Sequence, residues 1–241
     1  MSTSQQQHPP HASEEHSNTP ASSPRSSTPR HDESNKEWQR MISGEMYNAM
    51  DDFLVQARRK CRLEFLFPFN NLSEQQQDPP KFRESLMKQF MGHHGENSYI
   101  EPPFRCDYGS NIYYGKNFYA NFNCCMLDVC EIRIGDYVMF GPNVQIYTAT
   151  HPTDPFERTQ SGLEYGKPIT IGDYVWLGGG VIVNPGVTIG EGSTIGSGSV
   201  VTRDIPPYVV AAGNPCRVIK YLERPSTQAE SRQQHDQHHD E

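Results

Sequence analysis

The units IGDYVW, LGGGVI, VNPGVT, IGEGST, IGSGSV and VTRDIP follow one another without a gap from Ile171 to Pro206. The first place of every unit is apolar, and the fifth place is Val, Ser or Ile. The first place holds Ile171, Leu177, Val183, Ile189, Ile195 and Val201, and the fifth holds Val175, Val181, Val187, Ser193, Ser199 and Ile205. A period of six fits neither a helix nor one long strand. It fits short strands that are separated by corners and stacked as a parallel β-helix.

The second place of four of the six units is glycine, at positions 172, 178, 190 and 196. This pattern predicts a tight turn with a backbone conformation that residues with a Cβ resist. The same period occurs earlier in IGDYVM, FGPNVQ and IYTATH, which begin at Ile134, Phe140 and Ile146. Residues 151–168, HPTDPFERTQSGLEYGKP, interrupt it with turn-forming residues. We therefore expect a loop that leaves the stack and returns before Ile169.

The parts outside the repeats differ in composition. Residues 1–36 and 225–241 are rich in Ser, Pro, Gln and His, and we expect both tails to be disordered. Apolar residues recur at helical intervals between 37 and 60, and again from Phe82 to Phe90 with Gly92 as a stop. LEFLFPFNNLSE (63–74), broken by Pro68, is interpreted as a packed connection. The predicted organisation is a helical segment at 37–95 and a β-helix domain at 96–224.

Charge, leader and cysteine content exclude several classes of protein. The chain has a net charge of -8 with no basic cluster in its core, so nucleic acid is not an expected partner. No stretch is apolar enough to cross a bilayer, and the N-terminus lacks a basic start followed by an apolar run. We therefore expect a cytoplasmic protein without a membrane partner. The six cysteines form no CxxC pair and are interpreted as core residues, so no metal is expected.

Several motifs resemble one family beyond the repeats. They are MISGEMYNA (41–49), YGSNIYYGKNFYANFN (108–123), YTATHP (147–152), GLEYGKPITIGDYVWLGGG (162–180) and DIPPYVVAAGNPCRVIK (204–220). Over residues 36–223 the chain resembles the hexapeptide-repeat acyltransferases, especially the maltose, galactoside and nodulation O-acetyltransferases. The resemblance implies a left-handed, three-sided parallel β-helix, assembly as a homotrimer, and transfer of acetyl from acetyl-coenzyme A to a sugar hydroxyl.

This reaction needs a base, because a sugar hydroxyl attacks a thioester only as its proton is removed. The domain contains three histidines, and His151 opens the predicted loop. The resemblance aligns YTATHP with the family's catalytic histidine motif, so His151 is the predicted base. His93 and His94, beside Gly92 and Gly95, are interpreted as a solvated turn. Glu164, or a backbone carbonyl of the same loop, is expected to hold the imidazole, the alternative being that Glu164 is merely a solvated carboxylate.

The resemblance also places residues around the two substrates. Asn121 matches an asparagine that contacts both substrates, and its amide suits a developing oxyanion. Asp107 and Asp128 match sugar-binding positions, where carboxylates pair with hydroxyls. Val129 stands where galactoside enzymes have a second acidic residue, and Ala49 replaces an acidic residue in their N-terminal helix. These two departures argue against a preference for galactosides.

Coenzyme A is expected near the later repeats. Trp176 and Gly179 match positions beside the pantetheine arm, where small residues let the ligand approach the backbone. The other positions that the resemblance assigns to coenzyme A are Ser197, Thr202, Arg203, Arg217 and Lys220, with the cations available to its phosphates. The alternatives are a packing tryptophan at a corner and ordinary solvated cations.

Other functions are compatible with the same fold. The acceptor could be an antibiotic or another hydroxylated molecule, although the MISGEMYNA segment favours a sugar. A zinc hydratase on this coil needs three converging histidines, and only His93, His94 and His151 lie in the domain. A catalytically silent scaffold with partner-recruiting tails is a further alternative.

Overall fold

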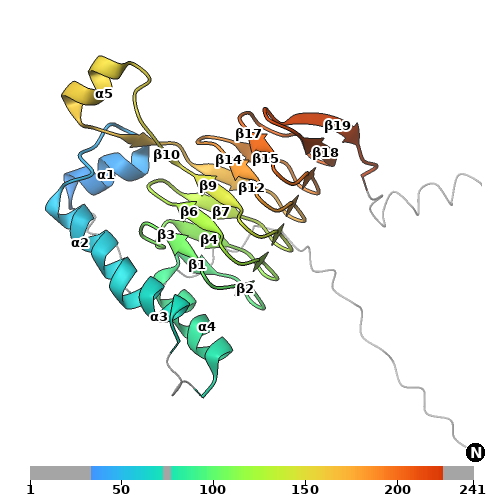
Figure 1. The fold of residues 1–241 in the computed structure, drawn as a ribbon, viewed down its shortest axis with the longest axis horizontal. Helices are drawn as coiled ribbons and strands as arrows, with labels where there is room; N and C mark the ends of the chain where they lie inside the picture. The colour runs from blue at the N-terminus through green and yellow to red at the C-terminus, as the bar shows by residue number, and fades with distance from the viewer. Residues whose placement is uncertain (1–33, 73–76, 225–241) are drawn as a thin grey trace, which may run out of the picture. The chain divides into compact units, whose positions relative to one another are not determined.

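The computed structural model describes residues 34–72 and 77–224, and the two predicted tails lie almost wholly outside these ranges. The described part begins with three helical stretches and continues as short strands that wind into a coil (Figure 1). The helical stretches are α1 (Lys36–Ser43), α2 (Asp52–Lys60) continued by a π-helical turn (Cys61–Leu66) and α3 (Phe67–Asn70), and α4 (Pro79–Phe90). The helical start thus lies at Lys36, one residue inside the predicted tail.

The strands form three parallel sheets that make up the sides of the coil, with successive strands passing from one sheet to the next. The first sheet contains β1 (His93–His94), β4 (Ile112–Tyr114), β7 (Ile132–Ile134), β12 (Ile169–Ile171) and β15 (Thr188–Ile189). The second contains β2 (Tyr99–Ile100), β5 (Tyr119–Ala120), β8 (Met139–Phe140), β13 (Trp176–Leu177), β16 (Thr194–Ile195), β18 (Val209–Ala212) and the antiparallel β19 (Arg217–Tyr221). The third contains β3 (Arg105–Cys106), β6 (Cys125–Leu127), β9 (Gln145–Tyr147), β14 (Ile182–Val183) and β17 (Val200–Val201). The predicted parallel β-helix of hexapeptide units is confirmed.

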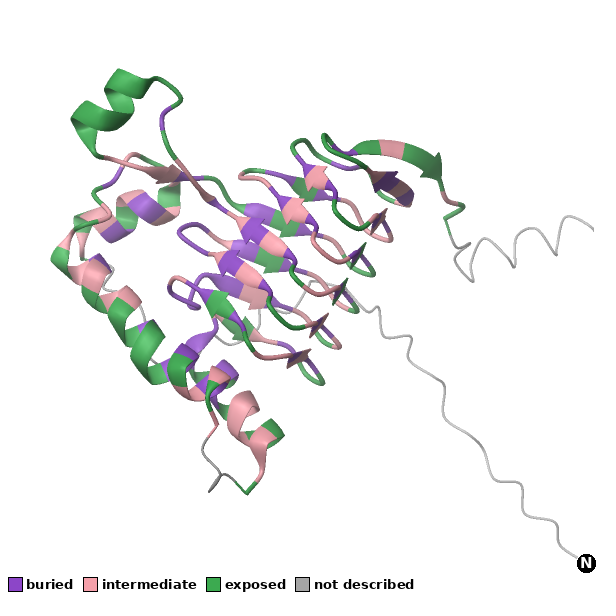
Figure 2. Ribbon diagram, in the orientation of Figure 1, coloured by how far each residue is buried: buried purple, intermediate pink, exposed green. Residues whose placement is uncertain are grey.

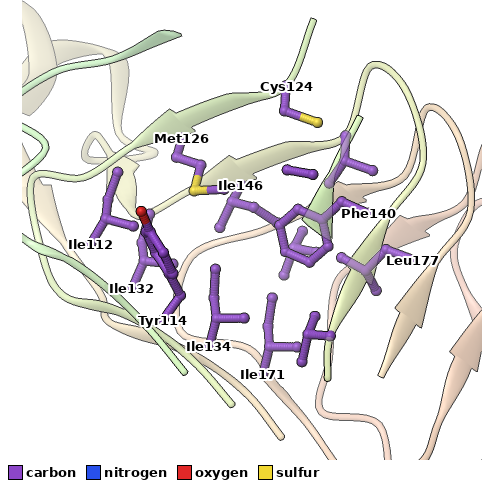
Figure 3. Packing of buried hydrophobic residues seen from close by; sticks show 14 of the residues in the cluster. Ile112, Tyr114, Cys124, Met126, Ile132, Ile134, Phe140, Ile146, Ile171 and Leu177 are labelled. Carbon is purple, nitrogen blue, oxygen red and sulfur yellow. The ribbon is translucent and has the colours of Figure 1, made fainter. Parts of the chain in front are cut away.

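Equivalent places of the repeat stack on each other inside the coil. Ile134 pairs with Ile171, which pairs with Ile189, and Phe140 pairs with Leu177 in the second sheet. All first and fifth places between 171 and 206 are buried, as the sequence predicts. Buried residues recur in the strands of the coil (Figure 2), and Figure 3 shows the side chains of Ile134, Phe140, Ile171 and Leu177 inside it. Two buried places are serines: the Ser193 hydroxyl donates to the Pro206 carbonyl at 2.8 Å, and the Ser199 hydroxyl accepts from the Gly213 N–H at 3.0 Å. The stacked apolar side chains supply the hydrophobic free energy of the coil.

The structural reason for the repeated glycines differs from the prediction. Within the repeat, positive φ values occur at the fourth place, for example 58° at Tyr174 and 68° at Gly192, and not at the second. The second place is glycine because the next turn is close: a Cβ on Gly190 would lie 2.3 Å from the backbone nitrogen of Pro207. The glycine is therefore selected by the spacing between turns and not by a left-handed backbone.

Two other segments differ from their predicted structure. Residues 61–70, expected as an irregular connection, are helical, and Phe65 and Phe69 are buried between α4 and the coil. Pro68 is the second residue of α3, which directly follows the π-helical turn, and the Phe67 N–H at the end of that turn donates to the Arg62 carbonyl five residues back. His93 and His94 form β1, the first strand of the first sheet, and not a solvated turn.

His94 is half-buried against Tyr114, and neither ring nitrogen has a hydrogen-bond partner among the described residues. Burial lowers the pKa of His94. As the pH falls, His94 is protonated in the unfolded chain near the ordinary histidine pKa, about 6.5, but only at a lower pH in the folded chain. The free energy of unfolding therefore falls as the pH falls below about 6.5. We expect the Tm to drop less between pH 7.5 and pH 5.5 in His94→Phe than in the parent protein. Equal drops in thermal scans would contradict this expectation.

Candidate active site

The chain leaves the coil near His151 and rejoins it at β12, which begins at Ile169, as the interrupted repeat predicts. The two ends of this excursion are tied together because β10 (Ala149–Thr150) pairs antiparallel with β11 (Tyr165–Gly166). Between them lies α5 (Pro155–Ser161), a helix that the sequence did not predict and that has no buried residue (Figure 2). The carboxylate of Asp154 caps it by accepting from two backbone N–H groups at 2.8 Å. This geometry holds His151 at the base of the excursion, beside the coil.

Glu164 faces His151 from the returning end of the excursion. Its Oε2 lies 3.6 Å from His151 Nε2, and the His151 side chain is 55% exposed against 20% for Glu164. An accessible imidazole beside a largely buried carboxylate can take a proton and have the resulting positive charge stabilised. Of the two groups that sequence analysis offered as partners of His151, the structure brings the Glu164 carboxylate close.

The other oxygen of Glu164 accepts a hydrogen bond from the hydroxyl of Tyr47. The same two residues form an isolated antiparallel bridge, with the Tyr47 N–H donating to the Glu164 carbonyl at 2.9 Å and the Glu164 N–H donating back at 3.2 Å. Tyr47 is fully buried and lies between α1 and α2, outside either helix. Sequence analysis missed it, because residues 47 and 164 are brought together only by the fold.

Asp107 lies after β3 in a partly buried position. Burial raises the pKa of its carboxyl, and the nearby guanidinium groups of Arg58 and Arg62 lower it. Arg58 is itself fixed, because its Nη1 donates to the Tyr108 hydroxyl at 2.6 Å and its Nη2 donates to the Ala49 carbonyl. The two arginines are additions to the sequence-predicted site. A carboxylate beside two guanidinium groups can bind several hydroxyls of one ligand.

Asp128, expected to bind sugar, is fully buried. Its Oδ1 accepts from the N–H groups of Asp107 and Tyr108 at 3.0 and 2.9 Å, and its Oδ2 accepts from the N–H of Asn111 at 3.3 Å. A carboxylate enclosed in this way has no surface to offer a ligand. Its place in the structure is to hold the turn that carries Asp107, which corrects the interpretation of Asp128 as a direct sugar ligand.

Asn121 and the pantetheine candidates share one corner of the coil, between the second and third sheets. The Asn121 side-chain oxygen accepts from the Phe122 N–H at 2.8 Å, and its NH₂ group remains a donor. Gly179 and Ser197 occupy the same corner two and three turns later, and a Cβ on Gly178 would lie 2.7 Å from the Ser197 nitrogen. Trp176 precedes this corner, half-exposed beside Met139. Gly179 is partly exposed and has no side chain, so a narrow ligand can approach its backbone.

The remaining coenzyme A candidates are spread over the last turns. Thr202 and Arg203 follow β17 and are exposed. Arg217 and Lys220 lie on β19, paired with Ala212 and Val210 of β18. Among the described residues, no hydrogen bond or ion pair joins these cations to each other or to an acidic side chain. They are therefore available to an anionic ligand.

The cysteines are unpaired within 34–72 and 77–224. Cys61 and Cys106 are neighbours, with their sulfurs 3.7 Å apart, and Cys130 donates to the Met41 carbonyl at 3.1 Å. Burial raises the pKa of the Cys106, Cys124 and Cys130 thiols, so they stay protonated. In the same ranges no three His, Cys, Asp or Glu side chains are grouped as metal ligands, and no helix has the length and apolarity that a membrane crossing requires.

The coil with a histidine at the base of an excursion defines the class of hexapeptide-repeat transferases. Residues 168–203 match the family description "Bacterial transferase hexapeptide (six repeats)", and residues 40–95 match "Maltose acetyltransferase hexapeptide capping motif". The chain belongs to the acetyltransferase family that includes the maltose and galactoside O-acetyltransferases.

Three relatives illustrate this membership. The structure of a maltose O-acetyltransferase from Clostridium difficile 630 is similar with a TM-score of 0.74 and 53% identity, over 78% of this chain and 98% of that one. The galactoside O-acetyltransferase of Escherichia coli is 44% identical over 76% of this chain and 88% of its own length. A hexapeptide-repeat acetyltransferase from Vibrio cholerae, complexed with acetyl-coenzyme A, has a TM-score of 0.71 and 36% identity, over 79% of this chain and 100% of that one.

Proposed function

We propose that this protein transfers acetyl from acetyl-coenzyme A to a hydroxyl of a sugar such as maltose, glucose or a galactoside, with His151 as the general base. The observation that carries the proposal is the exposed His151 imidazole 3.6 Å from the Glu164 carboxylate, at the base of the excursion. The complex of a structural relative with acetyl-coenzyme A supports the donor. The names of the maltose and galactoside relatives support a sugar acceptor.

The proposed reaction is direct transfer between two bound substrates. His151 takes the proton of the acceptor hydroxyl as its oxygen attacks the thioester carbonyl, and Glu164 stabilises the imidazolium. The Asn121 amide donates to the developing oxyanion. The carbon–sulfur bond then breaks, and the proton passes from His151 to the departing thiolate. The products are the acetyl ester and free coenzyme A, without a covalent enzyme intermediate.

The proposed substrate positions follow from the same arrangement. Asp107, supported by Asp128 beneath it, accepts from the hydroxyls of the sugar. Trp176 and Gly179 line the pantetheine arm, and Ser197, at the same corner as Gly179, contacts coenzyme A. Thr202, Arg203, Arg217 and Lys220 are proposed to contact the rest of coenzyme A, with the three cations on its phosphates. We propose a homotrimer in which a neighbouring copy completes the site, because Trp176 and Met139 leave an apolar outer face on the second sheet.

We expect acetyl-coenzyme A to be consumed in the presence of maltose or glucose, and more slowly with galactosides, because Ala49 and Val129 remove acidic partners. The measurement is release of free thiol across a panel of glucosides, galactosides and maltose, with a no-acceptor control. The panel also contains hydroxylated antibiotics and simple alcohols. Thiol release confined to the non-sugar acceptors would overturn the sugar assignment, and failure to bind coenzyme A in calorimetry would leave a silent scaffold.

A further inference from the structure

Tyr47 connects the N-terminal helical segment to the acid–base pair. Its ring is buried in a cluster with Trp38, Met41 and Leu54 from the helices and Tyr108 and Val129 from the coil. Its backbone is bridged to Glu164 in both directions. A ring held in this way has one position for its hydroxyl, and that hydroxyl donates to Glu164 Oε1.

Glu164 is shared between two partners, Tyr47 and His151, and among the described residues no hydrogen bond joins these two. One carboxylate oxygen accepts from Tyr47, and the other lies 3.6 Å from the imidazole of His151. Glu164 ends an excursion whose helix α5 is exposed along its whole length, so the excursion offers no packing to hold this side chain. The Tyr47 hydroxyl supplies the orientation that the excursion lacks.

We propose that Tyr47 is a positioning residue for the acetyl transfer: its hydroxyl holds the Glu164 carboxylate in the one orientation that faces His151. The inference rests on the proposed function, and it adds a residue from the capping segment to the catalytic machinery. Burial raises the pKa of Tyr47, so the hydroxyl keeps its proton and remains a donor. The helical segment thus acts in the reaction and does not merely cover the end of the coil.

The test compares Tyr47→Phe with the parent enzyme. The substitution keeps the buried ring and removes one oxygen. Because Glu164 is partly exposed, water can take the place of the lost donor, and we expect a Tm within a few degrees of the parent. We expect kcat to fall about tenfold, as for other partners that orient a reacting group, with the KM for acetyl-coenzyme A unchanged.

A double-mutant cycle separates positioning from packing. If Tyr47 acts through Glu164, then Tyr47→Phe combined with Glu164→Gln is no slower than Glu164→Gln alone. Tyr114→Phe is the matched control, because it also removes a buried tyrosine hydroxyl, but inside the coil and away from the excursion. We expect Tyr114→Phe to keep the parent kcat. If the double variant loses kcat by the product of the two single losses, the two residues act independently and the proposal is overturned. A kcat for Tyr47→Phe within twofold of the parent would also overturn it.

A second readout does not depend on turnover. The ring ¹⁵N signals of His151, assigned by comparison with His151→Ala, report the environment of the imidazole in the free protein. We expect them to move in Tyr47→Phe, through the change at Glu164, and to stay in Tyr114→Phe. If the parent shows no acetyl transfer, the proposed function fails while a shift of these signals still supports the link. If the parent is active and the His151 signals are the same in Tyr47→Phe as in the parent, the positioning role of Tyr47 is refuted while the proposed function stands.

Discussion

Replacing His151 by alanine is expected to lower kcat for acetyl transfer by about 10²- to 10⁴-fold, the contribution typical of a positioned general base. The hydroxyl is then left to lose its proton to water, while the corner that carries Trp176 and Gly179 is unchanged. The measurement is thiol release at saturating acetyl-coenzyme A, together with calorimetry of coenzyme A binding. We expect the Kd for coenzyme A to stay within about twofold of the parent, since a base that acts on the acceptor contributes to kcat.

The matched control for this variant is His93→Ala. His93 is an exposed histidine on β1, at the start of the coil, and its removal leaves the excursion intact. Its turnover should equal that of the parent. A His151→Ala enzyme with near-normal kcat would contradict the assignment of the base, and so would equal losses in the two variants.

The second large effect is expected at Asp128, in stability. Asp128→Ala removes the acceptor of three backbone N–H groups: those of Tyr108 and Asn111, which are buried, and that of Asp107, which is partly buried. Each buried donor without a partner costs about 1–3 kcal/mol, so the loss in free energy of unfolding should be about 3 kcal/mol or more. Asp128→Asn keeps an acceptor for two of the N–H groups but turns its own NH₂ towards the third, and we expect a loss of about 1–3 kcal/mol. Urea unfolding followed by circular dichroism measures both.

The pH dependence of these variants identifies the ionisation of Asp128. Burial raises the pKa of this carboxyl to about 7. In the unfolded chain this carboxyl has its ordinary pKa of about 4. Between about pH 4 and 7 it is therefore protonated in the folded protein and ionised in the unfolded chain, so the free energy of unfolding falls as the pH rises through that range. Asp128→Asn cannot ionise, so its deficit relative to the parent should shrink from pH 4 to pH 7. A constant deficit would contradict the raised pKa.

Asp136→Ala is the control for the loss of a carboxylate that accepts from backbone. Its Oδ1 accepts from the Lys116 N–H at 2.9 Å, but at an exposed corner of the coil where water can replace it. We expect a loss well below that of Asp128→Ala. Equal losses would mean that burial is not the cause of the Asp128 effect.

Local patterns predicted most of the fold. The six-residue period predicted the parallel β-helix, and the broken period located the excursion at His151, because the first place of each unit is apolar and buried in the coil. The same patterns were misleading where contacts between turns decide a residue. Gly190 has the pattern of a turn glycine, yet it is glycine because a Cβ at this position would collide with Pro207 of the next turn. His93 and His94 read like a solvated turn, yet they pair with β4.

The candidate site divides in the same way. His151, Asn121 and Trp176 stand in motifs that can be recognised in one stretch of chain, so the sequence alone indicated them. The sequence also determined the coil itself, because each turn repeats the same local requirement for apolar and small residues. Tertiary structure alone decided that Tyr47 meets Glu164, 117 positions away, and that Asp128 lies beneath Asp107 instead of facing a ligand. The physical reason is that burial and hydrogen-bond partners depend on which turns and helices pack together, and a local sequence pattern does not show which residues far apart in the chain will meet.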